Sequence, residues 1–149
     1  MKKIIILLFA SVLGLGACEK DLNQPEIINP AATIIFNGNI NTISGTYSSY
    51  ATATPATKGT GTVSLAITYS GDIKTLNFST TTGTVTNNLG TATVSGGAYT
   101  FVRLVKDLRG VADAPLPTSG TTGSVVLSVL ATLGDGTTVK RFFTINIAN

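Results

Sequence analysis

The chain of 149 residues contains no histidine and no tryptophan, and it has one cysteine and one methionine. Only 11% of its residues are charged. The lack of histidine excludes Ser-His-Asp and Cys-His nucleophilic sites, and it leaves no imidazole ligand for zinc or iron. A single cysteine cannot form an internal disulfide, so the fold has to be stabilised by packing.

Acidic side chains are also scarce, because no glutamate follows residue 30 and the aspartates after it are Asp72, Asp107, Asp113 and Asp135. Asp72 and Asp135 lie in turn motifs, where aspartate is favoured for its backbone hydrogen bonds. Asp107 and Asp113 remain as a candidate catalytic pair, and no Asp-x-Asp spacing offers the clustered oxygens that calcium needs. No motif supports a Ser-Lys site. We therefore expect no enzymatic activity, no metal site and no cofactor.

The first residues have the features of a secretory signal. Lys2 and Lys3 are followed by an uncharged, mostly apolar run over 4–16. That run would be about 20 Å long as a helix, whereas a membrane span needs about 20 apolar residues. We expect residues 1–17 to form a cleaved signal peptide. The alternative, a buried N-terminal helix of the mature fold, is less favoured because the run has no polar face.

The apolar run ends at Leu15-Gly16-Ala17-Cys18. This sequence resembles the bacterial lipobox, in which a leucine and two small residues precede a lipid-modified cysteine. The resemblance implies diacylglycerol on the Cys18 thiol, cleavage between Ala17 and Cys18, and acylation of the new amino group with a fatty acid such as palmitate. The alternative is an ordinary free thiol. A membrane reached through this lipid anchor is the first expected partner.

Residues 18–30 are polar, charged and contain proline, as expected for a solvated tether. The segment Cys18-Glu19-Lys20-Asp21 is similar to the acidic export signal of surface lipoproteins in the Bacteroidota, although Leu22 stands where that signal has a second acidic residue. The resemblance implies an outer-membrane lipoprotein at the cell surface. The alternative is a plain spacer, with the protein on the periplasmic face.

Processing also changes the charge balance. The net charge of +3 includes Lys2 and Lys3, so loss of the signal leaves eight basic and seven acidic side chains, a net charge of +1. A nearly neutral chain has no electrostatic footprint for nucleic acid. We therefore expect no nucleic-acid partner.

The remaining segment, 31–149, has the composition of a β domain, with 25 threonines and 16 glycines in the whole chain. Val63, Leu65, Ile67 and Tyr69 alternate with small or polar residues, which is the period of a half-buried strand. Similar patterns, separated by turn signals at 70–72, 87–90 and 134–136 and by a Gly-Gly hairpin signal at 96–97, predict strands over 63–69, 73–79, 91–95, 98–105, 125–133 and 137–147.

Four segments carry further predictions. Apolar residues on both faces of 125–133 predict a central, well-covered strand. Segment 37–61 predicts one or two edge strands with long loops, and segment 103–110 predicts a strand end that runs into one turn of helix. Segment 110–123 contains two prolines and predicts a long crossover between sheets.

These patterns predict an all-β fold, namely a Greek-key β-sandwich of about seven strands. The closing pattern, two strands joined by Gly134-Asp135-Gly136, resembles the last hairpin of bacterial immunoglobulin-like domains. The chain lacks the cysteines and tryptophan of antibody domains, so the resemblance implies the wider immunoglobulin-like sandwich class.

Candidate contact residues are aromatic or basic. Tyr47 and Tyr50 could stack on a sugar or anchor a protein partner, or could be half-buried edge tyrosines. Arg103, Lys106 and Arg109 could contact an anion or partner, or could form a solvated strand end. We expect a non-enzymatic binding or accessory module whose partner is a surface protein or glycan. The alternative is a structural or adhesin-like subunit that assembles through sheet edges.

Overall fold

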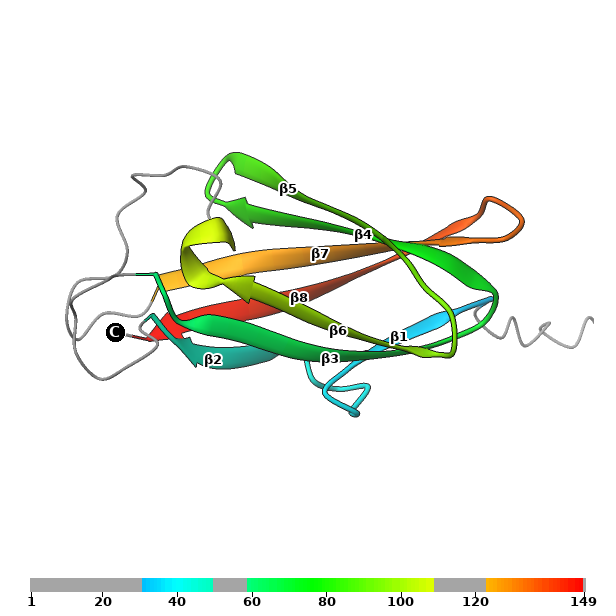
Figure 1. Ribbon diagram of the computed structural model, residues 1–149, viewed down its shortest axis with the longest axis horizontal. Helices are drawn as coiled ribbons and strands as arrows, with labels where there is room; N and C mark the ends of the chain where they lie inside the picture. Colours follow the sequence, from blue (N-terminus) through cyan, green and yellow to red (C-terminus); the bar gives the residue numbers. More distant parts are fainter. Residues whose placement is uncertain (1–30, 50–58, 109–122, 149) are drawn as a thin grey trace, which may run out of the picture.

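The computed structural model describes residues 31–49, 59–108 and 123–148 (Figure 1). In these residues the chain forms eight strands and one short 3-10 helix: β1 (Thr33–Phe36), β2 (Ser44–Ser48), β3 (Thr62–Ser70), β4 (Ile73–Thr82), β5 (Val85–Thr93), β6 (Ala98–Leu104), η1 (Val105–Leu108), β7 (Gly123–Leu133) and β8 (Thr138–Ala148). The signal peptide and tether predicted over 1–30 lie outside the described residues.

The strands form two sheets that face each other. One sheet has the order β1-β3-β6, and the other has the order β2-β8-β7-β4-β5. All neighbours are antiparallel except β2 and β8, which run parallel. This division of the strands is that of an immunoglobulin-like Greek-key sandwich, with β1, β3 and β6 in one sheet and β5, β4, β7 and β8 in the other. The predicted fold class is confirmed.

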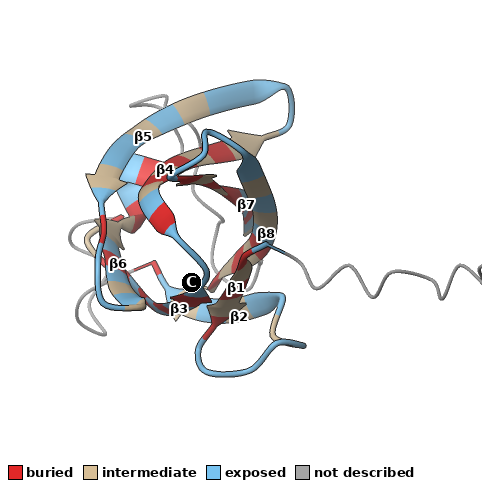
Figure 2. Ribbon diagram, turned by 90° about the vertical axis from the view of Figure 1, so that its right-hand side faces the viewer, coloured by how far each residue is buried: buried red, intermediate tan, exposed pale blue. Residues whose placement is uncertain are grey.

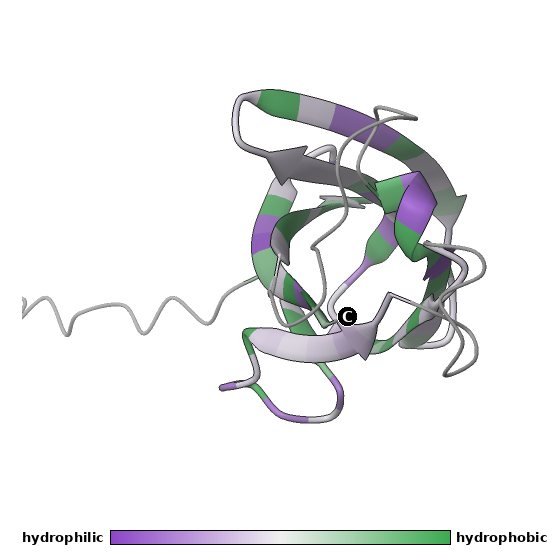
Figure 3. Cartoon of the chain, turned by 90° about the vertical axis from the view of Figure 1, so that its left-hand side faces the viewer, coloured by the Kyte–Doolittle hydropathy of each residue, from purple (hydrophilic) through white to green (hydrophobic). Residues whose placement is uncertain are grey.

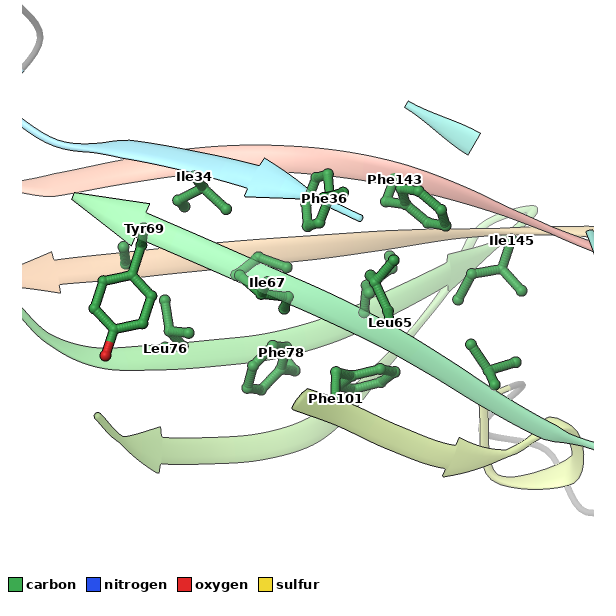
Figure 4. Close-up of a cluster of buried hydrophobic side chains, with 14 of the residues drawn as sticks. Ile34, Phe36, Leu65, Ile67, Tyr69, Leu76, Phe78, Phe101, Phe143 and Ile145 are labelled. Carbon is green, nitrogen blue, oxygen red and sulfur yellow. The ribbon is translucent and has the colours of Figure 1, made fainter. Parts of the chain in front are cut away.

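The apolar positions of the alternating strands form the core. In β3, Val63, Leu65, Ile67 and Tyr69 are buried and the residues between them are exposed. Seen from one end of the sandwich, buried segments of both sheets face each other (Figure 2). Aromatic rings join the sheets, with the Phe78 ring centroid 5.0 Å from that of Phe101 (Figure 4). Burying each such ring contributes about 2–3 kcal/mol.

The hairpin predicted at Gly96-Gly97 is wrong. The two glycines have φ values of 84° and 81°, as the Gly-Gly signal requires. However, they connect β5 in one sheet to β6 in the other, and β6 pairs with β3. The local signal determines only that the backbone turns, whereas the pairing of β6 with β3 places the second strand in the other sheet.

The turn predicted over 87–90 is also wrong, because these residues lie inside β5. The pairing of β4 with β5 shifts register there, since Phe78 pairs with Gly90 and Ser79 with Asn88, which leaves Leu89 as an extra bulged residue. Gly90 has a φ of 101°, which suits a bulge. The reversal between β4 and β5 instead occurs at 83–84, where Gly83 has a φ of 60°.

Other expectations hold where the structure describes them. Strand β7 is central, between β8 and β4, and β6 runs directly into the helical turn η1. Segment 37–61 contains one edge strand, β2, among its described residues. Strands β6 and β7 lie in different sheets, so the chain crosses between sheets there, although residues 109–122 of the predicted crossover lie outside the described part.

Candidate functional site

Tyr47 lies on the inner side of edge strand β2 and packs against the core. Its hydroxyl donates a hydrogen bond of 3.4 Å to the carbonyl of Ser64 on β3. Burial raises the pKa of the Tyr47 phenol above its ordinary value of 10.0, and a hydrogen bond with Asn37 acts in the opposite direction. These contacts identify Tyr47 as a half-buried edge tyrosine, which is one of the two alternatives that the sequence left open. Tyr50, the other candidate, lies outside the described residues.

Asn37 lies directly after β1, on the connection that leads to β2 in the other sheet. After β1 the backbone turns at Asn37, whose φ is 50°. Its backbone N–H donates to the Ala66 carbonyl at 2.8 Å, and its side-chain oxygen accepts from the Ala66 N–H at 3.2 Å. Asn37 and Tyr47 together form hydrogen bonds with the backbone of β3 at Ala66 and Ser64, beyond the point where β1 ends. Tyr47 is therefore part of the sandwich closure.

Arg103 also has internal partners. Its Nη2 donates to the Leu89 carbonyl on β5 at 3.1 Å, and its Nη1 donates to the Val102 carbonyl at 2.8 Å. The guanidinium carbon lies 5.6 Å from the centroid of the Phe101 ring. Arg103 thus links the edge strands of the two sheets and occupies one edge carbonyl on each. These contacts leave less of either edge open for pairing with another chain.

Lys106 has a different environment from Arg103. It lies on η1, is exposed, and its backbone N–H donates to the Gly59 carbonyl at 3.1 Å. Figure 3 shows η1 as a short turn with hydrophilic and hydrophobic bands. Of the predicted basic contacts in the described part of the chain, Lys106 is the one that presents its side chain to solvent. Arg109 lies outside the described residues.

The described carboxylates serve mainly local structure. The Asp72 and Lys74 side chains, 68% and 59% exposed, form an ion pair of 2.5 Å. Asp135 accepts from the Thr137 N–H at 2.9 Å and from its hydroxyl at 2.7 Å, and these bonds lower the pKa of Asp135. Asp107 is exposed on η1, and Asp113 lies outside the described residues. In the described ranges no three metal-ligating side chains come together.

A surface patch that was not predicted lies where β1 and its connection to β2 meet β8. We call Ile40, Ile43, Lys140 and Phe142 the β8-edge patch. The side chains of Ile40, Ile43 and Phe142 are 54%, 64% and 54% exposed. The Lys140 ammonium lies 5.2 Å from the centroid of the Phe142 ring. Exposed large apolar side chains mark a surface that can contact another molecule.

Hydrogen bonds hold the parts of this patch together. The Thr144 N–H donates to the Ile43 carbonyl at 2.8 Å. Arg141 on β8 donates through Nη1 to the Ile34 carbonyl and through Nη2 to the Ile40 carbonyl. Its guanidinium carbon also lies 5.6 Å from the centroid of the Phe36 ring. The segment 37–43 is therefore fastened along β8, and it projects from the sandwich in Figure 3.

Part of this patch could have been found in the sequence. Consecutive residues of a strand point to opposite faces, so Phe142 and Phe143 cannot both be buried in a two-layer sandwich. Phe143 is fully buried and Phe142 is exposed. Ile40 and Ile43 stand among asparagines, glycine and threonine, in a segment where apolar residues are unexpected. No local sequence pattern indicates that this segment contacts β8.

Comparisons with known proteins add little to this description. No protein-family model and no curated protein matches the chain. Among solved structures, the chain is similar to a structure of murine CRIg, with 11% identity and a TM-score of 0.40 over 78% of this chain and 96% of that one. The fold assignment rests on the strand order and pairing given above. In the described part of the chain no helix is long and apolar enough to span a membrane.

Proposed function

We propose that this chain is a bacterial lipoprotein, and that its sandwich is a non-enzymatic binding or accessory module held outside the cytoplasm by lipid on Cys18. The observation that carries the proposal is the order of segments. A sequence that resembles a lipobox ends at Cys18 and is followed by a polar segment, and the first strand of an immunoglobulin-like sandwich begins at Thr33. The order is that of an anchor, a spacer and a displayed domain.

The anchor chemistry supports permanent attachment. Each buried methylene contributes about 0.8 kcal/mol, and one acyl chain alone binds only marginally. Two or three chains on Cys18 make release negligible. Because the tether from residue 18 to residue 30 reaches at most about 45 Å when extended, the sandwich stays close to the membrane. We propose the outer membrane, with the domain at the cell surface or on the periplasmic face.

A binding role is supported by the residues that remain available on the sandwich. The aspartates at 72 and 135 have structural partners, and Tyr47 and Arg103 are engaged in the fold. Lys106 and the β8-edge patch are exposed. We propose Lys106 as a contact to a surface protein or glycan, since a solvated cation on a short turn can pair with an anionic group.

The anchor is tested by the intact mass of the protein extracted from membranes, beside a Cys18→Ala variant. We expect a mature mass that begins at Cys18 and includes lipid, and the variant should lack that lipid. Protease treatment of whole cells then distinguishes the surface from the periplasm. An unlipidated chain that retains Met1 would refute the lipoprotein assignment.

The binding role is tested by crosslinking on cells with wild type and a Lys106→Glu variant. Lys74→Gln serves as a surface control, because the Lys74 side chain is exposed and forms an ion pair with the exposed Asp72. We expect Lys106→Glu to lose a crosslinked species that wild type and Lys74→Gln retain. If all three proteins give the same crosslinking pattern, Lys106 is not the contact.

A further inference from the structure

The turn after β1 contains a chemically reactive pair of residues. Asn37 is the one asparagine in the sequence that is followed by glycine, Gly38. In such a pair the backbone nitrogen of the glycine can attack the side-chain amide carbon of the asparagine, because glycine has no Cβ to obstruct the approach. The sequence therefore offers one favoured position for the formation of a succinimide ring.

The fold places this pair in a tight, exposed turn. The φ values of Asn37 and Gly38 are 50° and 72°, and the Asn39 N–H donates to the Phe36 carbonyl at 3.1 Å. Two positive φ values with this hydrogen bond are typical of a type I′ turn, for which Asn-Gly is a preferred sequence. Apart from its chain neighbours, no described residue has an atom within 4 Å of the position that a Cβ on Gly38 would take. Both residues are exposed, so packing of the described residues does not shield them from water.

Hydrogen bonds restrain the Asn37 amide instead. Its side-chain oxygen accepts from the Ala66 N–H at 3.2 Å. The amide also forms a hydrogen bond with the Tyr47 phenol, and this bond acts to lower the pKa of Tyr47, so the amide nitrogen is the donor. The amide is therefore held at its oxygen and at its nitrogen. It has to leave Ala66 and Tyr47 before its carbon can meet the Gly38 nitrogen.

We propose that Asn37-Gly38 is a deamidation site that the folded sandwich protects through these two side-chain hydrogen bonds, and that it reacts when the turn opens. In the open turn the Gly38 nitrogen forms a bond to the Asn37 Cγ and loses its proton. The Cγ–Nδ2 bond breaks, and the leaving nitrogen takes up that proton and departs as ammonia. Water then adds to either carbonyl of the succinimide and opens the ring, which leaves aspartate or isoaspartate at position 37.

Each product alters the contacts that close the sandwich. Aspartate at position 37 can still accept from the Ala66 N–H, but it has no amide N–H for the Tyr47 phenol. Isoaspartate carries the main chain through its Cβ, which adds one carbon to the backbone and displaces the turn relative to β3. Because ammonia is lost to solvent, the change is permanent. A chain whose turn has once opened and reacted keeps a weakened connection between β1 and β2.

Tandem mass spectrometry of the tryptic peptide 21–58 measures the reaction, since Lys20 and Lys58 set the ends of this peptide. The full chain is incubated at mildly alkaline pH, folded and in urea, and then digested. Aspartate and isoaspartate at position 37 are counted together by the mass change of amide to carboxyl. Asn39 and Asn41 lie in the same peptide and serve as internal controls, because neither precedes glycine.

Each hydrogen bond to the amide should slow the reaction about fivefold. Folded wild type should therefore deamidate at position 37 at least about 25-fold more slowly than the chain in urea. Tyr47→Phe removes one of the two bonds and should react about fivefold faster than folded wild type, with an unchanged rate in urea. Arg103→Ala is the matched control, because it weakens the flank of β5 and β6 and leaves the Asn37 contacts intact. Its folded rate should equal that of wild type.

Several results would overturn the proposal. Equal rates for folded wild type and the chain in urea mean that the fold gives no protection, and an unmodified Asn37 in urea means that the pair is not a deamidation site. A folded Tyr47→Phe that reacts at the wild-type rate means that the phenol does not restrain the amide. If Arg103→Ala accelerates the reaction as much as Tyr47→Phe, global unfolding controls it and the local hydrogen bonds do not.

Discussion

Replacing Arg103 by alanine should destabilise the sandwich at the flank where β5 and β6 are both edge strands. The change removes the hydrogen bonds to the Leu89 and Val102 carbonyls and the contact with the Phe101 ring. Hydrogen bonds from a charged donor contribute about 1.5–3 kcal/mol each, and a cation–π contact about 0.5–1 kcal/mol. Arg103 is half-buried and its bond to Val102 is local, so we expect a loss of about 2–3 kcal/mol.

Urea unfolding followed by circular dichroism measures this loss. With a slope of about 1–3 kcal/mol per molar urea for a small domain, the midpoint should fall by about 1 M. Lys106→Ala is the matched control, since it removes an exposed cation three residues away and should change stability by less than about 0.5 kcal/mol. Arg103→Lys keeps the charge without the planar fork and should lie between wild type and Arg103→Ala.

Two results would refute this reasoning. If Arg103→Ala unfolds at the wild-type midpoint, the contacts across the flank do not stabilise the fold. If Lys106→Ala lowers the midpoint equally, the effect comes from general charge and not from the Arg103 geometry. We also expect Arg103→Ala to associate at high concentration, measurable by sedimentation, because it uncovers edge carbonyls on β5 and β6.

Three further predictions concern single positions in the sandwich. Tyr69→Phe should leave stability unchanged or raise it by about 1 kcal/mol in thermal unfolding, because the buried Tyr69 hydroxyl has no hydrogen-bond partner among the residues that the structure describes; a clear loss would contradict this. Gly61→Ala should cost more than about 3 kcal/mol, since its Cβ would lie 1.9 Å from the Ser48 carbonyl oxygen; an unchanged urea midpoint would refute the close approach. Burial raises the pKa of Tyr47 above 10.0, so the folded state holds this proton more tightly and stability is lost as pH rises through the folded pKa. Tyr47→Phe should therefore lose less stability than wild type between about pH 9 and 11, and parallel urea midpoints would contradict the assigned cause.

Several elements of the fold could be predicted because their signals are local. The alternation in β3 follows from the two-residue period of a strand, and it identified Val63, Leu65, Ile67 and Tyr69 as the buried positions. The Gly-Asp-Gly segment at 134–136 formed the predicted turn, since Asp135 accepts hydrogen bonds from Thr137 two residues away. Signals of this kind depend only on near neighbours in the chain.

The sequence predictions failed at residues whose structural role depends on contacts with residues far away in the sequence. Asn87 was placed in a turn, yet its side chain donates to the Asp107 carbonyl at 2.9 Å and helps to hold η1 against β5. Gly96-Gly97 was placed in a hairpin, yet it crosses between the sheets. Tyr47 and Arg103 were proposed as partner contacts, and their types and positions gave no sign of the carbonyls that they meet on β3 and β5.

The sequence by itself determined the all-β class, the inward face of the regular strands and the scarcity of groups suited to catalysis, because composition and two-residue periodicity are properties of short segments. The tertiary structure decided which strands share a sheet, that β2 runs parallel to β8, and that Phe142 faces outward while Phe143 is buried. The bond from Arg141 to Ile34 joins residues 107 positions apart. Pairings over such separations follow from the burial of whole strand faces, which no local pattern encodes.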